Sequence, residues 1–182
     1  LMDARRYGVP QARRRVVFVG IRVDFCSANV CTKDIEPSHP SPLGGPPIQL
    51  REALEGLPAE QEALRPTGRA LALAQCLRPG ESGAHLRKRY GHGPTDFSLQ
   101  RLHWDRVAPT VCKTVRPGQC GLLHPEGERF LSTAELKRIC SFPDDFRLPG
   151  SMQEQWARLG NSVPPKLMEA VARHLVEVLR GA

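Results

Sequence analysis

The stretch that decides the fold of this chain is residues 160–165, which read Gly-Asn-Ser-Val-Pro-Pro and lead into an amphipathic segment. A glycine lets the backbone approach a ligand closely, and a proline at the first helical position presets the first turn. Short polar side chains at a helix start can cap the helix or bind a carboxylate or amino group. The stretch therefore predicts a glycine turn and a compact polar cradle at the start of the last helix.

The segment after this stretch has the periodicity of a helix with one apolar face. The apolar side chains recur at helical spacing, and charged side chains occupy the opposite face. Glu169 and Arg173 are placed for an ion pair four residues apart. The apolar stripe predicts packing against another part of a core, and its members are Leu167, Met168, Val171, Leu175, Val178 and Leu179.

A second informative stretch lies near the other end of the chain. Residues 11–15 read Gln-Ala-Arg-Arg-Arg and follow a turn signal, Tyr-Gly-Val-Pro, at residues 7–10. Residues 16–23 are almost continuously apolar and rich in β-branched side chains, which predicts a buried strand. The three arginines are thus expected at the mouth of a strand, where functional loops commonly lie.

Composition constrains the number of domains and the class of partner only loosely. The chain has 182 residues, enough for one domain or two small ones, and a formal net charge of +7. Such a charge favours polyanionic partners, although a solvated basic surface explains it equally well. No apolar run is long enough to span a bilayer, and no signal-peptide pattern is present. We therefore predict no membrane association and a cytoplasmic protein associated with the bacterial nucleoid.

The six cysteines are scattered and form no Cys-x-x-Cys pair. Cys112, Cys120 and His124 fit no common zinc spacing, so no metal site is predicted. Free thiols in a reducing compartment explain the cysteines best.

The middle of the chain alternates between helical patterns and irregular stretches. Residues 36–47, rich in proline, glycine and serine, predict a linker, and helices are expected over about 50–57 and 69–77. Residues 81–121 are polar and basic and predict an irregular region with short strands, for instance near 110–114. Ser132 and Glu135 are spaced as a capping box for a further helix, which Pro143 stops.

Four segments in one order carry a resemblance to a known family. They are residues 7–15, with the Gln-x-Arg-x-Arg pattern; 101–110, running from an arginine to Pro-Thr; 131–146; and 158–165. In this order they resemble the C-terminal portion of the DNA (cytosine-5)-methyltransferases. The resemblance covers nearly the whole chain, and the Gly-Asn-Ser-Val-Pro-Pro string is its most specific part.

The resemblance implies a mixed α/β protein, a partial S-adenosylmethionine-dependent methyltransferase fold. Residues 1–24 would be the last strand region of a large catalytic domain, and residues 25–150 a small target-recognition domain with its linker. Residues 151–182 would carry the last motif and a helix that returns to the large domain. In this family double-stranded DNA lies between the two domains, and the target cytosine is flipped out of the duplex.

The resemblance also implies roles for single residues. Arg15 would contact the flipped cytosine or its flanking phosphate, Arg13 would support the same pocket, and Gln11 would order the loop. Taken alone, these arginines could equally cap a strand end in solvent. The S-adenosylmethionine site would be bordered by Asn161, Ser162 and Val163. A helix N-cap is the alternative for Asn161 and Ser162, and both roles can hold together.

DNA contacts are expected mainly from the basic region. Lysine and arginine would position the duplex through its phosphates, and a few side chains would reach base edges. Trp104 is expected to pack the small domain rather than to stack on a base. The residues predicted to bind DNA are Arg14, Lys88, Arg89, Arg101, Lys113 and Arg116.

One departure from the family pattern concerns the chemistry itself. The family's nucleophile is a cysteine that follows a proline, and none of the six cysteines does so. We expect that motif before Leu1, in the same chain or in a separate subunit, and hence a chain inactive alone and poorly stable when isolated. Two alternatives stay open: a non-catalytic DNA-binding or regulatory module, and a tRNA cytosine-5 methyltransferase on the same scaffold.

Overall fold

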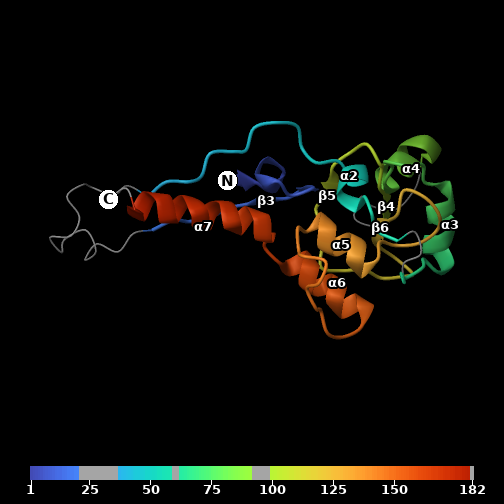
Figure 1. Cartoon of the computed structure of the whole chain (residues 1–182). Helices are drawn as coiled ribbons and strands as arrows, with labels where there is room; N and C mark the ends of the chain where they lie inside the picture. Colours follow the sequence, from blue (N-terminus) through green and yellow to red (C-terminus); the bar gives the residue numbers. More distant parts are fainter. Residues whose placement is uncertain (21–36, 59–61, 92–98, 181–182) are drawn as a thin grey trace.

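The computed structural model describes residues 1–20, 37–58, 62–91 and 99–180. It is a mixed α/β molecule with an elongated outline (Figure 1), in which a long C-terminal helix and the N-terminal segment lie beside a more compact group of helices and short strands. The buried side chains form two separate clusters, which define a smaller and a larger body.

The smaller body joins the two ends of the described chain. It contains β1 (Met2–Asp3), the 3-10 helix η1 (Ala4–Tyr7), β3 (Arg14–Arg15) and helix α7 (Pro165–Arg180). Strands β1 and β3 pair antiparallel, with Met2 opposite Arg15. Its core consists of Met2, Ala4, Tyr7, Val9, Leu167 and Val171.

The larger body is built from five helices and three short strands among the described residues. The helices are α2 (Leu50–Leu54), α3 (Gly68–Cys76), α4 (Gly83–Tyr90), α5 (Thr133–Ile139) and α6 (Met152–Asn161). Strand β4 (Leu99–Arg101) pairs in parallel with β6 (Gly121–Leu123), and β5 (Ala108–Pro109) pairs in parallel with β2 (Gln11–Ala12) from the N-terminal segment. Its core includes Leu99, Leu123, Phe130, Leu136, Ile139 and Trp156.

Local sequence signals explain several of these elements. The predicted capping box forms at α5, where the Glu135 backbone N–H donates to the Ser132 hydroxyl at 3.1 Å and the Ser132 N–H donates to the Glu135 carboxylate at 2.8 Å. Ser151 and Glu154 form a second such box at α6. The helices predicted near 50–57 and 69–77 are confirmed as α2 and α3, and Gly56, with φ of 75°, follows α2.

The predicted strand over residues 16–23 is wrong for its described part. Residues 16–20 form no strand, and Val16 and Phe18 are 60% and 92% exposed. Residues 21–23 lie outside the described part of the chain. An apolar run becomes a buried strand only if neighbouring strands pair with it, and no described strand lies beside residues 16–20.

Three further expectations needed correction. The region 81–121 contains helix α4, whose turns are stabilised by the capping pair of Ser82 and His85. The strand expected at 110–114 ends earlier, as β5 at Pro109. Gly160 and Asn161 do not form a turn before the last helix; they are the last two residues of α6.

The prediction of an amphipathic last helix is confirmed as α7. Pro164 accepts the first helical hydrogen bonds from Leu167 and Met168, so Pro165 is the first helical residue, as expected for proline. Leu167 and Val171 are buried, whereas Met168 and Leu179 are 42% and 50% exposed. The predicted stripe is therefore only partly covered by the described residues. Among those residues, no helix combines the length and apolar character that a bilayer crossing needs.

Candidate recognition and base-pocket site

Two sequence motifs far apart in the chain meet where the two bodies touch. Strand β2 runs parallel to β5, so that Gln11 lies opposite Ala108 and Ala12 opposite Pro109. The Thr110 hydroxyl donates to the Ala12 carbonyl at 2.6 Å. The Pro-Thr segment is thereby fastened to the segment that carries the three arginines. We call the contact region of residues 11–13, 111–113, 139–140 and 160 the junction.

Gln11 is fully buried in the junction. Its Nε2 donates to the Ile139 carbonyl at 3.5 Å and contacts Cys140 Sγ at 3.3 Å. Its Oε1 accepts from the Val111 N–H at 3.3 Å. One amide side chain therefore links the N-terminal segment to the end of α5 and to the loop after β5.

Arg13 is buried as well, with only 2% of its surface exposed. Its Nη1 donates to the Val111 carbonyl at 3.0 Å, and its Nη2 donates to the Gly160 carbonyl at 2.8 Å. Burial lowers the pKa of the guanidinium from its ordinary value, and the nearby charge of Arg15 lowers it further. The side chain is turned into the protein, where its guanidinium is bound to backbone carbonyls of the junction.

Gly160 is required where α6 meets the loop after β5. A Cβ atom there would lie 2.5 Å from the Cys112 carbonyl oxygen and 2.6 Å from Lys113 Cα. These are backbone atoms, which cannot move as a flexible side chain can. The predicted close approach at this glycine is thus directed at the protein's own backbone, which leaves the ligand approach predicted from the sequence without support here.

Arg14 and Arg15 emerge from the junction toward solvent. The Arg14 side chain is 68% exposed and lies 3.7 Å from the Asp3 carboxylate. Arg15 is half-buried, and its Nη1 donates to the Arg14 carbonyl at 2.7 Å. No carboxylate holds the Arg15 guanidinium within the described part of the chain, so its planar fork is available to a phosphate or a carbonyl oxygen.

The residues predicted to border a cofactor lie between α6 and α7. Asn161 is exposed, and Val163 is 43% exposed. Ser162 ends α6, and its hydroxyl donates to the Leu159 carbonyl at 2.7 Å. Ser162 is therefore a C-cap and not the N-cap of α7 that the sequence suggested. An exposed amide beside a hydroxyl with free lone pairs can bind a polar group.

One predicted DNA contact does not fit the structure. Arg101 is 6% exposed, and its guanidinium donates to four carbonyl oxygens of the larger body. The acceptors are Leu77 at 2.9 Å, Ala74 at 2.8 Å, His124 at 3.1 Å and Gly127 at 2.5 Å. Arg101 organises the interior, as the resemblance to a motif that organises the recognition domain would suggest, and we remove it from the set of DNA contacts.

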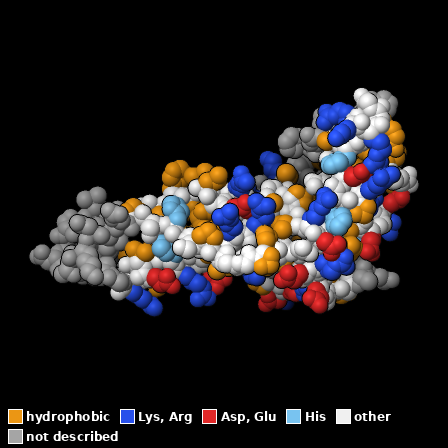
Figure 2. Space-filling view, turned by 90° about the horizontal axis from the view of Figure 1, so that it is seen from above, with side chains coloured by type: hydrophobic (Ala, Val, Ile, Leu, Met, Phe, Trp, Pro, Cys, Tyr) orange, Lys and Arg blue, Asp and Glu red, His pale blue; other side chains and the backbone are white. Residues whose placement is uncertain are grey.

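The other predicted DNA contacts lie at the surface. Lys88 and Arg89 are in the last turn of α4, where Arg89 pairs with Glu81 and lies 5.8 Å from the Tyr90 ring centroid. Lys113 and Arg116 are exposed in the loop between β5 and β6. Figure 2 shows lysine and arginine side chains distributed over the described part of the face in view, with acidic side chains at the lower edge and also among the basic ones.

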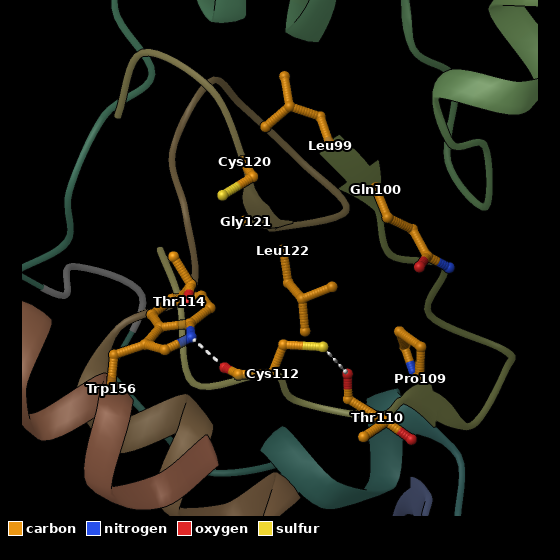
Figure 3. Close-up of a pocket in the computed structure, with 10 residues that line it drawn as sticks. All are labelled: Leu99, Gln100, Pro109, Thr110, Cys112, Thr114, Cys120, Gly121, Leu122 and Trp156. Carbon is orange, nitrogen blue, oxygen red and sulfur yellow. Dashed lines mark hydrogen bonds between the residues drawn. The ribbon is translucent and has the colours of Figure 1, made fainter. Parts of the chain in front are cut away.

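A pocket of about 250 Å³ opens on the larger body next to the junction (Figure 3). Its walls come from β4, β6, the loop after β5 and α6, and the Trp156 indole N–H donates to the Cys112 carbonyl at 3.0 Å across its base. Leu99, Leu122 and Trp156 make it mainly apolar, while Thr110 and Thr114 line it from different sides. Within the described ranges, no three His, Cys, Asp or Glu side chains come together to hold a metal ion.

The sequence reasoning missed two features of this region. Ser141 has a left-handed φ of 61°, and its hydroxyl accepts from the Lys166 N–H at 3.2 Å, so a residue after α5 caps α7. Glu135 is buried between Arg129, at 2.7 Å, and His124, at 3.6 Å. The capping-box spacing located Glu135, but no local signal pairs it with His124 or pairs Ser141 with α7.

Comparison with known proteins agrees with this geometry. A family model described as C-5 cytosine-specific DNA methylase matches residues 1–177, and the chain belongs to that family. The type II methyltransferase M.SacI of Streptomyces achromogenes is 34% identical over 97% of this chain, and M.PspPI of Psychrobacter sp. (strain TA137) is 28% identical over 97%. The chain spans about half the length of these relatives, 50% and 44% respectively.

A solved structure shares the fold. The crystal structure of a putative DNA modification methyltransferase encoded within an E. coli prophage matches 98% of this chain and 59% of its own, with a TM-score of 0.52 and 18% identity. The predicted fold class, a mixed α/β protein with a partial methyltransferase fold, is confirmed. The predicted domain boundaries stay predictions, although Trp156 and Leu159 of α6 belong to the core of the larger body.

Proposed function

We propose that this chain is the target-recognition and C-terminal part of a DNA (cytosine-5)-methyltransferase. The complete enzyme would transfer a methyl group from S-adenosylmethionine to C5 of a cytosine flipped out of duplex DNA. The observation that carries the proposal is the junction, where β2, the Pro-Thr loop, the end of α5 and Gly160 interlock. Four family motifs that are far apart in sequence form one unit there, with Arg15 at its edge.

Arg15 is proposed to hold the flipped base or the phosphate beside it. Extruding a base costs a few kcal/mol of stacking and pairing, so the enzyme must stabilise the extruded state. A guanidinium can donate two parallel hydrogen bonds to a carbonyl oxygen or a phosphate and stays charged throughout. Arg15 is half-buried and lies two residues from the buried Arg13. Its backbone is therefore held in place while its guanidinium can reach a ligand.

Asn161, Ser162 and Val163 are proposed to form one wall of the S-adenosylmethionine site. When bound, this cofactor supplies the electrophilic methyl group. The Asn161 amide offers both a donor and an acceptor, and the Ser162 hydroxyl keeps acceptor lone pairs while it donates to Leu159. These residues orient a polar group at the junction of α6 and α7, and the remaining walls belong to the proposed N-terminal part.

The nucleophile is proposed to lie in that N-terminal part. Cys140 is buried in the junction, and burial raises the pKa of its thiol to about 11, which keeps it protonated at neutral pH. Cys112 is exposed but follows a valine, whereas the family's nucleophile follows a proline. We therefore assign the reactive thiolate to a partner segment, in the same chain or in a second subunit.

The basic side chains of the larger body are proposed to position the duplex. Lys88, Lys113 and Arg116 are exposed and would contact phosphates, each releasing about one counterion. Lys88→Gln should lower the slope of log affinity against log salt by about one unit. Arg173, exposed on α7 and paired with Glu169 at 2.7 Å, is the matched control. Fluorescence anisotropy with a labelled duplex measures both slopes, and equal slopes would remove Lys88 from the interface.

A complementation assay tests the proposed function. This chain is combined with an N-terminal half that carries the Pro-Cys motif, and transfer of tritiated methyl groups to duplex DNA and to tRNA is measured. We expect transfer to duplex cytosines only with both halves present, and loss of transfer with Arg15→Ala. Transfer to tRNA alone would establish the RNA alternative. DNA binding without transfer by any combination would favour a non-catalytic module.

A further inference from the structure

Burying the charged guanidinium of Arg13 in the core is unfavourable in free energy. Taking such a charge out of water costs several kcal/mol, and an apolar side chain of similar volume is often as stabilising or more so. No carboxylate pairs with Arg13 among the described residues, and its Nε has no hydrogen-bond partner there. Stability of the core alone does not explain this side chain.

The geometry of Arg13 shows what only a guanidinium can do at this place. One planar fork donates to the Val111 carbonyl at 3.0 Å and to the Gly160 carbonyl at 2.8 Å. Val111 belongs to the core of the larger body and Gly160 ends α6, just before the crossing to α7. Arg13 itself lies between β2 and β3, on the segment that enters the smaller body.

We propose that Arg13 is a positioning residue that holds the two bodies in one fixed orientation and does not itself touch DNA or the target base. Its hydrogen bonds to the Val111 and Gly160 carbonyls close a ring that runs through β2, the loop after β5 and the end of α6. The fixed orientation in turn places Arg15, two residues further on, within about 7 Å of chain from a rigid anchor. This proposal extends the proposed function, since it assigns Arg13 and Arg15 different tasks.

The chain offers a matched control in Arg101. Both arginines are buried, both donate to backbone carbonyls, and no carboxylate from the described residues pairs with either guanidinium. All four acceptors of Arg101 lie within the larger body, whereas Arg13 spans the two bodies. Loss of Arg101 should weaken the larger body and leave the orientation unchanged.

Double electron–electron resonance on this chain measures the orientation directly. Spin labels are attached through a ketone-bearing amino acid at Lys88 on α4 and at Ala172 on α7, both exposed and on different bodies. We expect a narrow distance distribution for the parent chain and for Arg101→Met. We expect Arg13→Met to broaden it about twofold or more, because hinge motion replaces a fixed contact.

Arg13→Lys separates the guanidinium geometry from the charge. A lysine keeps the charge but has no planar fork, so we expect an intermediate width. If Arg13→Met does not fold, as judged by circular dichroism, Arg13→Lys decides: a broadened distribution supports the proposal, and the parent width contradicts it. A parent-like distribution for a folded Arg13→Met variant overturns the proposal outright.

Kinetics in the complemented enzyme give an independent readout. A misplacement of about 1 Å at a reacting centre can lower a rate about 100-fold. We expect Arg13→Lys to lower kcat about 10- to 100-fold with KM for DNA nearly unchanged, because the ground-state contacts of the larger body remain. A rise in KM alone would point to a direct DNA contact instead. An inactive parent would contradict the proposed function but leave the distance result standing.

Discussion

Substituting Gly160 by alanine sets two physical effects against each other. Gly160 lies inside helix α6, where alanine is favoured over glycine by about 1 kcal/mol. Helix propensity alone therefore predicts that Gly160→Ala stabilises the protein. The structure predicts the opposite, because the added methyl group would lie 2.5 Å from the Cys112 carbonyl oxygen and 2.6 Å from Lys113 Cα.

The cost can be worked out from the contacts that α6 would lose. Carbon atoms pack at about 3.5–4.0 Å, so α6 and the loop after β5 must separate by about 1 Å. Such overpacking costs about 1–3 kcal/mol. The shift also stretches the Arg13–Gly160 bond of 2.8 Å and the Trp156–Cys112 bond of 3.0 Å, which contribute about 1 kcal/mol each. After the gain in helix propensity is subtracted, we expect Gly160→Ala to lower the free energy of unfolding by about 2–4 kcal/mol.

Urea unfolding followed by tryptophan fluorescence measures this difference, because Trp156 lies four residues before the substitution in the same helix. Gly44→Ala is the control: a Cβ at Gly44 meets nothing within 4 Å, so alanine there should be neutral or stabilise by about 0.5 kcal/mol. An unchanged or raised midpoint for Gly160→Ala would show that α6 does not press against residues 112 and 113, and the account of the junction would be wrong.

Three other predictions follow from the buried polar groups. Arg101→Met should lower the free energy of unfolding by about 3 kcal/mol or more, since four carbonyls lose their donor; a urea midpoint within error of the parent would contradict this. Peptide mapping after thiol labelling should find Cys112 modified in the folded chain and Cys140 modified only after unfolding, and early labelling of Cys140 would refute its burial. Stability should fall between pH 7 and pH 4, and a flat profile would contradict the following reasoning. Burial would raise the pKa of Glu135, but the hydrogen bonds from Arg129 and the Ser132 N–H, together with the charges of Arg129 and His124, outweigh it and hold that pKa below the ordinary 4.5, while burial lowers the pKa of His124 below 6.5. Both folded-state pKa values lie below the unfolded ones, so their stabilisation is present above those ordinary values and is lost as the pH falls.

Local signals in the sequence located α2, α3, α5 and α7 but not α4 or α6. The capping pair Ser132 and Glu135 and the alternating faces of residues 166–180 predicted α5 and α7, because both depend on neighbours three or four residues away. The same reasoning failed at residues 16–20. A strand depends on partners elsewhere in the chain, and no described strand pairs with these residues.

The candidate site was predicted in its parts but not in its arrangement. The Gln-x-Arg-x-Arg pattern marked Gln11, Arg13 and Arg15 together, yet only the structure separates the buried Arg13 from the outward Arg15. Arg101 looked like a surface cation because its neighbours in sequence are polar and basic. Its burial follows from carbonyls up to 27 residues away, which no local pattern reveals.

Gly160 illustrates the same limit from the other side. The sequence predicted that a ligand approaches the backbone closely there, whereas the group that the structure places against Gly160 is the Cys112–Lys113 backbone. A glycine in the sequence indicates that another group approaches the backbone closely, but it does not indicate which group. The polar neighbours Asn161 and Ser162 suggested a helix start, whereas they end α6 and Pro165 begins α7.

The most direct test of the central claim uses this 182-residue chain without any other polypeptide. Duplex DNA is incubated with the chain and tritiated S-adenosylmethionine, and label on cytosine is counted beside a measurement of DNA binding. The account predicts salt-dependent binding of the duplex and no transfer of label. Label on C5 of cytosine from the purified chain alone would contradict the assignment of the nucleophile to a separate part of the enzyme.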